Sequence, residues 1–248
     1  MKRLIDAKTE ALALQMQLEG PLVRLSKVGK LGVYSWSLQA LNTCPASIKS
    51  NGELVDSCKG CYAAFGMYNY ANVKAPREYN RWAWKQDNFV SDFVEILNAS
   101  HKYFRWLDSG DLYSLALAEK VYEIMKATPE TKHWLPTRMH KFDKFKDVLN
   151  RMAALPNVVV RLSSDSVMGD LVDKPEGLNI GTSSTIIPEQ YLSDFEGKGQ
   201  FICKAYYQEG KCKTCRACYD KNVETVAYVG HGKVLKSLQA KRIALTEV

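Results

Sequence analysis

Hydrophobic and polar positions along the chain form repeated units of a short apolar strand and an amphipathic helix. Strands rich in β-forming residues are expected at 31–40, 102–107, 133–135, 157–162, 177–182 and 201–205. Apolar positions at helical spacing predict helices at 76–98, 112–127 and 141–154, after a helical or irregular lead-in at 1–31. Strands and helices that alternate at this spacing predict right-handed crossovers and a parallel sheet.

We therefore predict an α/β fold, a partial (β/α) barrel of about six parallel strands, in preference to a doubly wound sheet. The barrel is expected to span residues 1–198 and to carry an N-terminal cysteine loop. Residues 199–248 are expected to form a C-terminal cysteine-cluster segment that binds a metal or cluster and packs on the barrel.

Polar residues gather just after several predicted strands. They are Asp108 and Asp111, Thr137 and Arg138, Ser163, Ser164 and Asp165, and Ser183 and Ser184. Ligands bind at the carboxyl edge of parallel α/β sheets, so these side chains are candidates for a binding site. The same residue types cap helices that follow strands, which leaves a structural interpretation open for each of them.

Three cysteines, Cys44, Cys58 and Cys61, lie on the loop after the first predicted strand, with the spacing C-x13-C-x2-C. The two residues between Cys58 and Cys61 allow both thiolates to converge on one metal. Three thiolates on a cubane iron–sulfur cluster leave one iron open to a small molecule, and three ligands on zinc leave one position for water or substrate. The alternative interpretation is a set of buried thiols or part of a structural zinc site.

A second group, Cys203, Cys212, Cys215 and Cys218, contains the run C-x2-C-x2-C. This run resembles the ligand run of ferredoxin-type cubanes, with Cys203 as the fourth ligand of a second [4Fe–4S] cluster. A structural zinc site with four thiolates is the other interpretation. In either case we expect a closed four-thiolate site that folds the C-terminal segment, carries electrons, or does both.

Composition and charge narrow the class of protein without naming a substrate. The 248 residues are 46% hydrophobic and 25% charged, as in ordinary globular proteins. No apolar run is long enough to cross a membrane, and Asp6 and Glu10 fall where a signal peptide needs an apolar core. We therefore expect a cytoplasmic protein with no membrane partner, whose seven cysteines bind metal rather than form disulfides. The net charge of +7 is compatible with a nucleotide or nucleic-acid partner.

The stretch NTCP at 42–45, followed by CKGCYA at 58–63, resembles the cysteine loop of radical S-adenosylmethionine (SAM) proteins. It is most similar to small phage-encoded relatives whose loops end in Cys-Tyr-Ala. Those relatives also tend to carry stretches like 104–111, 134–138 and 203–218 of this chain, so the resemblance covers residues 33–220. The chain departs from the common pattern in its first gap, which has thirteen residues where most of the superfamily has three.

The resemblance implies a [4Fe–4S] cluster at the first three cysteines, with SAM chelated to the open iron. It implies that Ser109, Gly110 and Asp111 face the SAM amino group and that Arg138, with Thr137, lies near the carboxylate. Ser163, Ser164 or Asp165 would then lie near the ribose. The candidate catalytic carboxylates are Asp108, Asp111 and Asp165.

The resulting hypothesis is an iron–sulfur, radical SAM-like enzyme, phage-encoded and active in the host cytoplasm, that takes electrons from a donor and acts on a nucleotide or nucleic acid. A second hypothesis is a tRNA-guanine transglycosylase-like base-exchange enzyme, with Asp108 and Asp165 as catalytic carboxylates and zinc at 203–218; it leaves the N-terminal cysteines unexplained. A third is a non-catalytic, metal-bound nucleic-acid-binding module, suggested by the charge and by aromatic residues interleaved with basic ones at 68–85.

Overall fold

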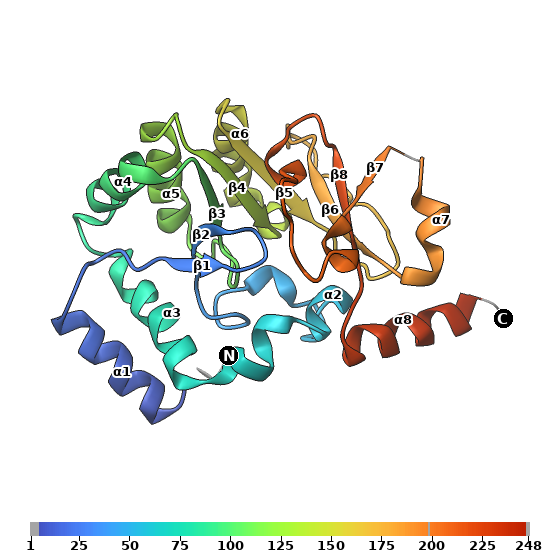
Figure 1. The fold of residues 1–248 in the computed structure, drawn as a ribbon, viewed down its shortest axis with the longest axis horizontal. Helices are drawn as coiled ribbons and strands as arrows, with labels where there is room; N and C mark the ends of the chain where they lie inside the picture. Colours follow the sequence, from blue (N-terminus) through green and yellow to red (C-terminus); the bar gives the residue numbers. More distant parts are fainter. Residues whose placement is uncertain (1–4, 198, 247–248) are drawn as a thin grey trace.

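An eight-stranded, mostly parallel sheet organises residues 5–197 and 199–246, which are the residues that this computed structural model describes (Figure 1). The strand order is β1-β2-β3-β4-β5-β6-β8-β7. β1 runs antiparallel to β2, and every other neighbouring pair is parallel. The strands are β1 (Ser26–Val28), β2 (Val33–Trp36), β3 (Tyr103–Trp106), β4 (Lys132–Thr137), β5 (Val158–Ser163), β6 (Ser183–Ile187), β7 (Gln200–Ile202) and β8 (Thr225–Val229).

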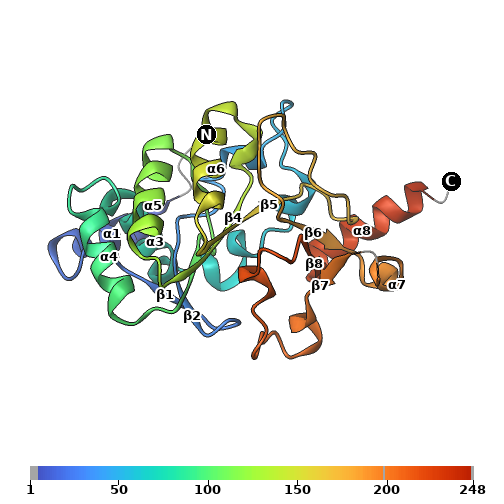
Figure 2. The same ribbon diagram turned by 90° about the horizontal axis from the view of Figure 1, so that it is seen from above.

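Three of the helices, α4, α5 and α6, lie side by side on one face of the sheet (Figures 1 and 2). Two βαβ units, β3-α5-β4 and β4-α6-β5, form the middle of the sheet, as the alternation of patterns predicts. The helices are α1 (Ala7–Leu18), α2 (Asp56–Lys59), α3 (Ala71–Ala83), α4 (Phe89–Ser100), α5 (Leu115–Ala127), α6 (Lys146–Ala154), α7 (Leu192–Phe195) and α8 (Lys233–Thr246).

The two faces of the sheet have different chemistry because side chains alternate along each strand. On β3, Phe104 and Trp106 are fully buried against the helices, and Trp106 stacks on Phe93 of α4 with ring centroids 4.9 Å apart. Tyr103 and Arg105 therefore point to the opposite face. The C-terminal segment covers that face, and its Tyr219 packs edge-on against Tyr103, with ring centroids 5.1 Å apart.

The structure corrects several element predictions. Residues 177–182 form no strand; Leu178 and Ile180 are buried in the core, and β6 begins only at Ser183. The predicted helix at 76–98 is two helices, α3 and α4, separated at 84–88. β1, β6 and β8 lie outside all predicted strands, and the described residues contain eight strands rather than about six. The predicted strand at 201–205 corresponds to β7, which ends at Ile202.

No helix within residues 5–197 and 199–246 has the length and apolar character needed to cross a membrane.

The buried imidazole of His133 makes the stability of the fold sensitive to acid. The indole N–H of Trp106 donates to its Nδ1 at 3.1 Å, so Nδ1 must stay unprotonated, and Nε2 lies 2.9 Å from the Thr128 hydroxyl. Burial lowers the pKa of His133 to about 3. Because the unfolded chain binds this proton near pH 6.5, the stability that neutral His133 provides is lost as the pH falls from about 6.5 towards 3.

We expect the free energy of unfolding to fall by about 2 kcal/mol between pH 7 and pH 5 because of His133. The measurement is urea unfolding of the wild type and of His133→Gln at both pH values. Gln can accept from Trp106 and donate to Thr128 without titrating, so the variant should lack this part of the pH dependence. The other histidines contribute equally to both proteins; equal slopes in the two proteins would contradict the assignment.

Candidate metal and ligand site at the sheet edge

The N-terminal cysteine loop leaves the carboxyl end of β2 and folds back on itself. Residues 48–54 form a small excursion that an antiparallel bridge between Ile48 and Leu54 closes. The Val55 amide donates to the Ser47 carbonyl at 2.9 Å, which joins the two ends of the excursion. The thirteen residues between Cys44 and Cys58 therefore do not form one extended stretch, because residues 48–54 leave the loop and return to it.

The three thiols of this loop form one group. Cys58 is buried, Cys44 and Cys61 are half-buried, and all three are free thiols. Burial raises the pKa of each of them, and the neighbouring Asp111, Cys58 and Cys61 raise the pKa of Cys44 further. The Arg138 guanidinium opposes this effect at both Cys58 and Cys61. The Ser47 amide donates to the Cys44 carbonyl at 3.0 Å and the Cys61 amide to the Cys58 carbonyl at 3.2 Å, so the bridge at the base of residues 48–54 joins the two parts of the loop that carry the cysteines.

This donor set fits an iron–sulfur cluster. Three soft thiol ligands come from one loop, and a bound metal would supply the positive charge that favours buried thiolates. Within the part of the chain that the structure describes, no three His, Cys, Asp or Glu side chains have the spacing of ligands to a single metal ion. The thiolates of a cubane each bind a different iron atom, so a cluster site does not require that spacing.

The buried carboxylate of Asp111 ties the loop after β3 to the end of β4. It accepts hydrogen bonds from the Leu112 amide at 2.8 Å, the Thr137 hydroxyl at 2.7 Å and the Arg138 amide at 2.9 Å. Burial raises the pKa of Asp111, whereas these three donors lower it. The Asp111 amide donates to the carbonyl of Thr43, the residue before the first cysteine, at 3.0 Å. Asp111 is thus a fixed acceptor beside the cysteine loop.

Ser109 and Gly110 set how closely the turn after β3 approaches the cysteine loop. Gly110 has a φ of +80°, and a Cβ there would lie 2.6 Å from the Thr43 hydroxyl and 2.7 Å from Cβ of Leu38. The Ser109 hydroxyl donates to the Leu38 carbonyl at 2.7 Å and accepts from Arg77 Nε at 2.7 Å. The backbone of this turn therefore lies directly against the loop that carries Cys44.

Arg138 links the cysteine loop to the end of β5. Its guanidinium donates to the Ser57 hydroxyl at 2.8 Å and to the Ser164 carbonyl at 2.9 Å. Its Nε lies 3.3 Å from one carboxylate oxygen of Asp165, and Lys141 pairs with the other. The predicted residues after β3, β4 and β5 therefore meet around the three thiols, and the structure adds Ser57 and Lys141 to them.

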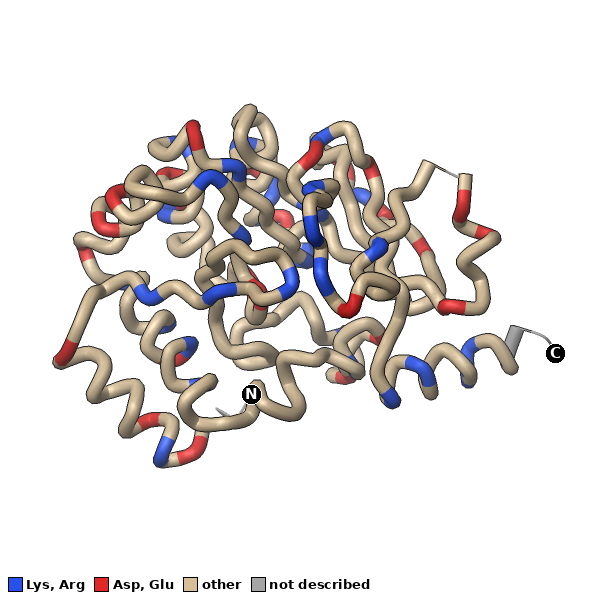
Figure 3. Tube along the Cα trace, viewed as in Figure 1, with Lys and Arg blue, Asp and Glu red and all other residues tan. Residues whose placement is uncertain are grey.

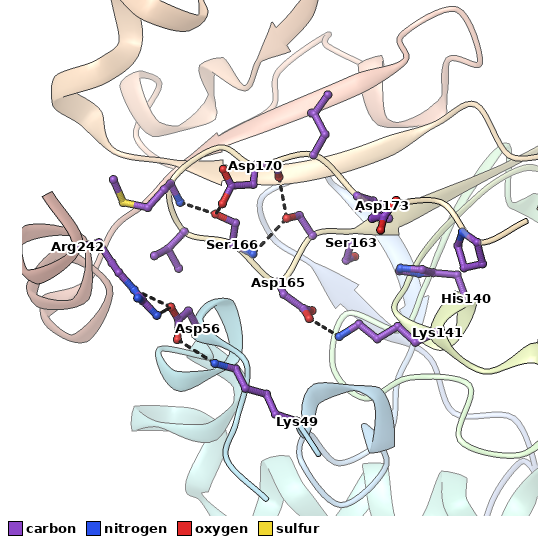
Figure 4. Close-up of a pocket in the computed structure, with 16 residues that line it drawn as sticks. Lys49, Asp56, His140, Lys141, Ser163, Asp165, Ser166, Asp170, Asp173 and Arg242 are labelled. Atoms are coloured by element: carbon purple, nitrogen blue, oxygen red, sulfur yellow. Dashed lines mark hydrogen bonds and ion pairs between the residues drawn. The ribbon is translucent and has the colours of Figure 1, made fainter. Parts of the chain in front are cut away.

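A cleft of about 550 Å³ opens beside this group at the carboxyl end of β5 (Figure 4). Burial lowers the pKa of His140, which lines the cleft, to about 4, so this imidazole is neutral at pH 7. Cations, carboxylates and hydroxyls together give the cleft the chemistry to bind a polar ligand that carries both charges and hydroxyls. Those that line it include Lys49, Asp56, Lys141, Ser163, Asp165 and Arg242.

Ser183 and Ser184 lie inside β6, so the prediction that they follow a strand is wrong. Ser183 pairs with Leu162 and Ser184 with Ser163, which places the start of β6 level with the end of β5. The Ser183 hydroxyl lies 2.9 Å from the hydroxyl of Thr225 on β8 and is buried there. This pair of serines therefore supports the packing of the sheet.

Asp108, a candidate catalytic carboxylate, is held by three side chains. One oxygen lies 2.6 Å from Arg105 Nη1, and the other accepts from the Tyr68 hydroxyl at 3.2 Å. The Tyr62 hydroxyl donates to the Asp108 carbonyl at 2.6 Å. The Asp108 carboxylate thus binds Arg105 and Tyr68, and its backbone carbonyl anchors the residue that directly follows Cys61.

The four C-terminal cysteines gather on the sheet face opposite α4, α5 and α6. Cys212 and Cys218 pack beside Trp134 and Tyr219. Burial raises the pKa of Cys212, and the charges of the other three cysteines of the group raise it further. The Tyr228 hydroxyl lies 3.4 Å from Cys218 Sγ. All four are free thiols.

Arg161, in the middle of β5, holds the end of this cysteine segment in place. Its fully buried guanidinium donates to the carbonyls of Ala217 at 2.8 Å, Asp220 at 2.9 Å and Val223 at 2.8 Å. Its Nε donates to the Cys218 carbonyl at 3.2 Å. The sequence carries a signal for Arg161 and for Arg105 that our predictions missed: each is a charged residue inside an otherwise apolar strand, where it needs a buried partner.

The fold and these contacts define an α/β protein with a mostly parallel sheet, one cysteine group at the carboxyl edge and a second on the sheet face opposite α4, α5 and α6. The chain belongs to the gene product 88 family, whose model matches residues 6–221 and so includes all seven cysteines. This family is phage-associated. No curated protein and no solved structure matches the chain.

We expect Gly110→Ala to destabilise the protein more than Gly177→Ala. Gly177 has a similar φ of +78°, but nothing lies within 4 Å of its Cβ position. The control therefore measures the cost of the left-handed backbone, about 1 kcal/mol, and the crowding at Gly110 should add at least about 1 kcal/mol. Urea unfolding of both variants tests this. Equal losses of unfolding free energy would show that the turn after β3 is not closely packed against the cysteine loop.

Arg161→Met should cost at least about 3 kcal/mol of unfolding free energy, because it leaves several buried carbonyls without a donor. Limited proteolysis should then cut within 203–223 faster than in the wild type. Arg151→Met is the matched control: Arg151 pairs with Glu119 and Asp147 at the surface, and its loss should cost less than about 1 kcal/mol. Wild-type protection of 203–223 in Arg161→Met would contradict the role given to this guanidinium.

Proposed function

We propose that this protein is an iron–sulfur enzyme of the radical SAM type, in which Cys44, Cys58 and Cys61 hold a [4Fe–4S] cluster and SAM binds beside it. The sheet would then act as a partial (β/α) barrel with the reaction at its carboxyl edge. We further propose that the protein is phage-encoded and modifies a nucleotide or nucleic acid in the host cytoplasm.

The observation that carries the proposal is the way residues 48–54 fold out of the cysteine loop. The bridge at their base leaves three thiols in one group, directly after a parallel strand, despite the long first gap. Residues from the ends of β3, β4 and β5 surround that group. A purely structural thiol cluster does not require such a convergence at the ligand-binding edge of the sheet.

When bound, the cluster would supply the electron for reductive cleavage of SAM, and the protein would bind and orient the reactants. Arg138, whose charge acts on both Cys58 and Cys61, would bind the SAM carboxylate, and it contacts Ser57 and Asp165. The fixed carboxylate of Asp111 and the backbone at Gly110 supply acceptors for an ammonium group. Hydroxyls at the end of β5, such as Ser163, face the cleft and suit a ribose.

The substrate class rests on the cleft and on the net charge. The cleft beside the thiols mixes cations with carboxylates and hydroxyls, which suits the phosphates and sugars of a nucleotide. The net charge of +7 favours an anionic partner. The four C-terminal thiols would hold a second [4Fe–4S] cluster or zinc, and an electron donor would reduce the protein.

We expect Cys44→Ala, Cys58→Ala and Cys61→Ala each to remove about half of the iron if the C-terminal group also holds a cubane. Each should abolish formation of 5′-deoxyadenosine from SAM after reduction with dithionite. The measurements are iron, sulfide and zinc counts, an absorbance spectrum under anaerobic conditions, and chromatography of the products. Arg151→Met, altered on a distant surface, is the control and should keep both iron and activity.

Unchanged iron in all three variants would refute the cluster assignment. A cluster-replete protein that forms no 5′-deoxyadenosine with nucleotides present would refute the radical mechanism. A colourless protein with stoichiometric zinc would instead favour the base-exchange enzyme.

A further inference from the structure

Arg105 lies between the two cysteine groups. Its guanidinium is 4.6 Å above the ring of Trp134, which packs against the C-terminal cysteine segment. On the other side, its Nη1 lies 2.6 Å from Asp108, and the two side chains are only 14% and 15% exposed.

Asp108 continues this contact to the N-terminal cysteine loop. Its carbonyl accepts from Tyr62, the residue directly after Cys61, at 2.6 Å, and its carboxylate accepts from Tyr68 at 3.2 Å. The rings of Tyr62 and Tyr68 meet edge to face, with centroids 5.4 Å apart. A continuous set of contacts thus runs from the C-terminal thiols through Arg105 and Asp108 to the residue beside Cys61.

The net charge of the C-terminal cysteine group determines how that group acts on Arg105. Four thiolates with either Zn²⁺ or a [4Fe–4S]²⁺ core carry a net charge of about −2, whereas four protonated thiols carry none. A partly buried guanidinium is stabilised by a second anion nearby and destabilised when that anion is lost. Loading of the C-terminal group therefore favours the buried position of Arg105 in which it pairs with Asp108.

We propose that Arg105 and Asp108 are positioning residues, which hold the Tyr62–Tyr68 segment and thereby Cys61 in place when the C-terminal cysteine group carries its metal. The proposal rests on metal binding at the cysteine groups, as in the proposed function, but not on radical chemistry, because zinc and a cubane give the same net charge. By linkage, the N-terminal cluster would in turn strengthen metal binding at the C-terminal group.

The test is amide hydrogen exchange of residues 61–70 in the full chain, purified anaerobically and without SAM, with metal counted in every sample. Cys215→Ser removes a C-terminal ligand and touches neither Arg105 nor Asp108. We expect exchange in 61–70 to become at least about fivefold faster in this variant than in the loaded wild type. Unchanged exchange in a variant that has lost its C-terminal metal would overturn the proposal.

The variant Arg105→Met distinguishes a specific coupling between the two cysteine groups from a general loosening of the fold. Arg105→Met keeps all seven cysteines, so it should retain its C-terminal metal. The amides of residues 61–70 should exchange fast in this variant, and adding Cys215→Ser should not make that exchange faster. Arg105→Lys should restore part of the response to Cys215→Ser. Asp108→Asn is the second variant if Arg105→Met does not fold, and it should lose the response in the same way.

Arg77→Met is the matched control, because Arg77 also lies against this segment, 4.8 Å above the Tyr68 ring, whereas Arg105 is the guanidinium that lies over Trp134. It should speed exchange yet keep the response to Cys215→Ser. A full response in Arg105→Met would show that the two groups are coupled by another route and would overturn the proposal. Formation of 5′-deoxyadenosine enters none of these measurements, so a failure of the radical mechanism is distinguished from a failure of the coupling.

Discussion

The buried carboxylate of Asp111 is the contact on which the carboxyl edge of the sheet depends. A buried charge is costly unless hydrogen bonds satisfy it, and three donors from the loops after β3 and β4 do so here. The backbone of the same residue binds Thr43, which holds the cysteine loop against the sheet. A shift of β3 relative to β4 would remove the donors Thr137 and Arg138 from this carboxylate, so the position of Arg138 depends on it.

The two faces of the sheet are stabilised by different interactions. The face under α4, α5 and α6 buries aromatic and aliphatic side chains and stabilises the fold through packing. The opposite face carries Arg105 and Arg161, and the polar backbone of the C-terminal cysteine segment satisfies Arg161. Apolar contacts add to this, because Tyr219 of the segment packs against Tyr103 and Trp134 on the same face. Basic residues also surround the segment on this face (Figure 3).

Strong local patterns made the central strands predictable, and weak ones produced the errors. β3, β4 and β5 combine apolar runs with a following helix, and the structure confirms them. Leu178 and Ile180 have the same apolar character but are buried without joining the sheet, so burial alone was misread as a strand. The placement of Ser183 in β6 depended on the register with β5, which no local pattern encodes.

The sequence by itself determined the α/β class, the strand ends that carry polar residues, and the division of the seven cysteines into two groups, because spacing and periodicity are local properties. Only the tertiary structure decided that residues 48–54 fold away from the cysteine loop and that Arg138 reaches Asp165. It also decided that Asp108 pairs with Arg105 and the two tyrosines, instead of standing free at the edge of the sheet. The physical reason is that partners of buried charges are chosen by strand register and by loop closure, which join residues far apart in the chain.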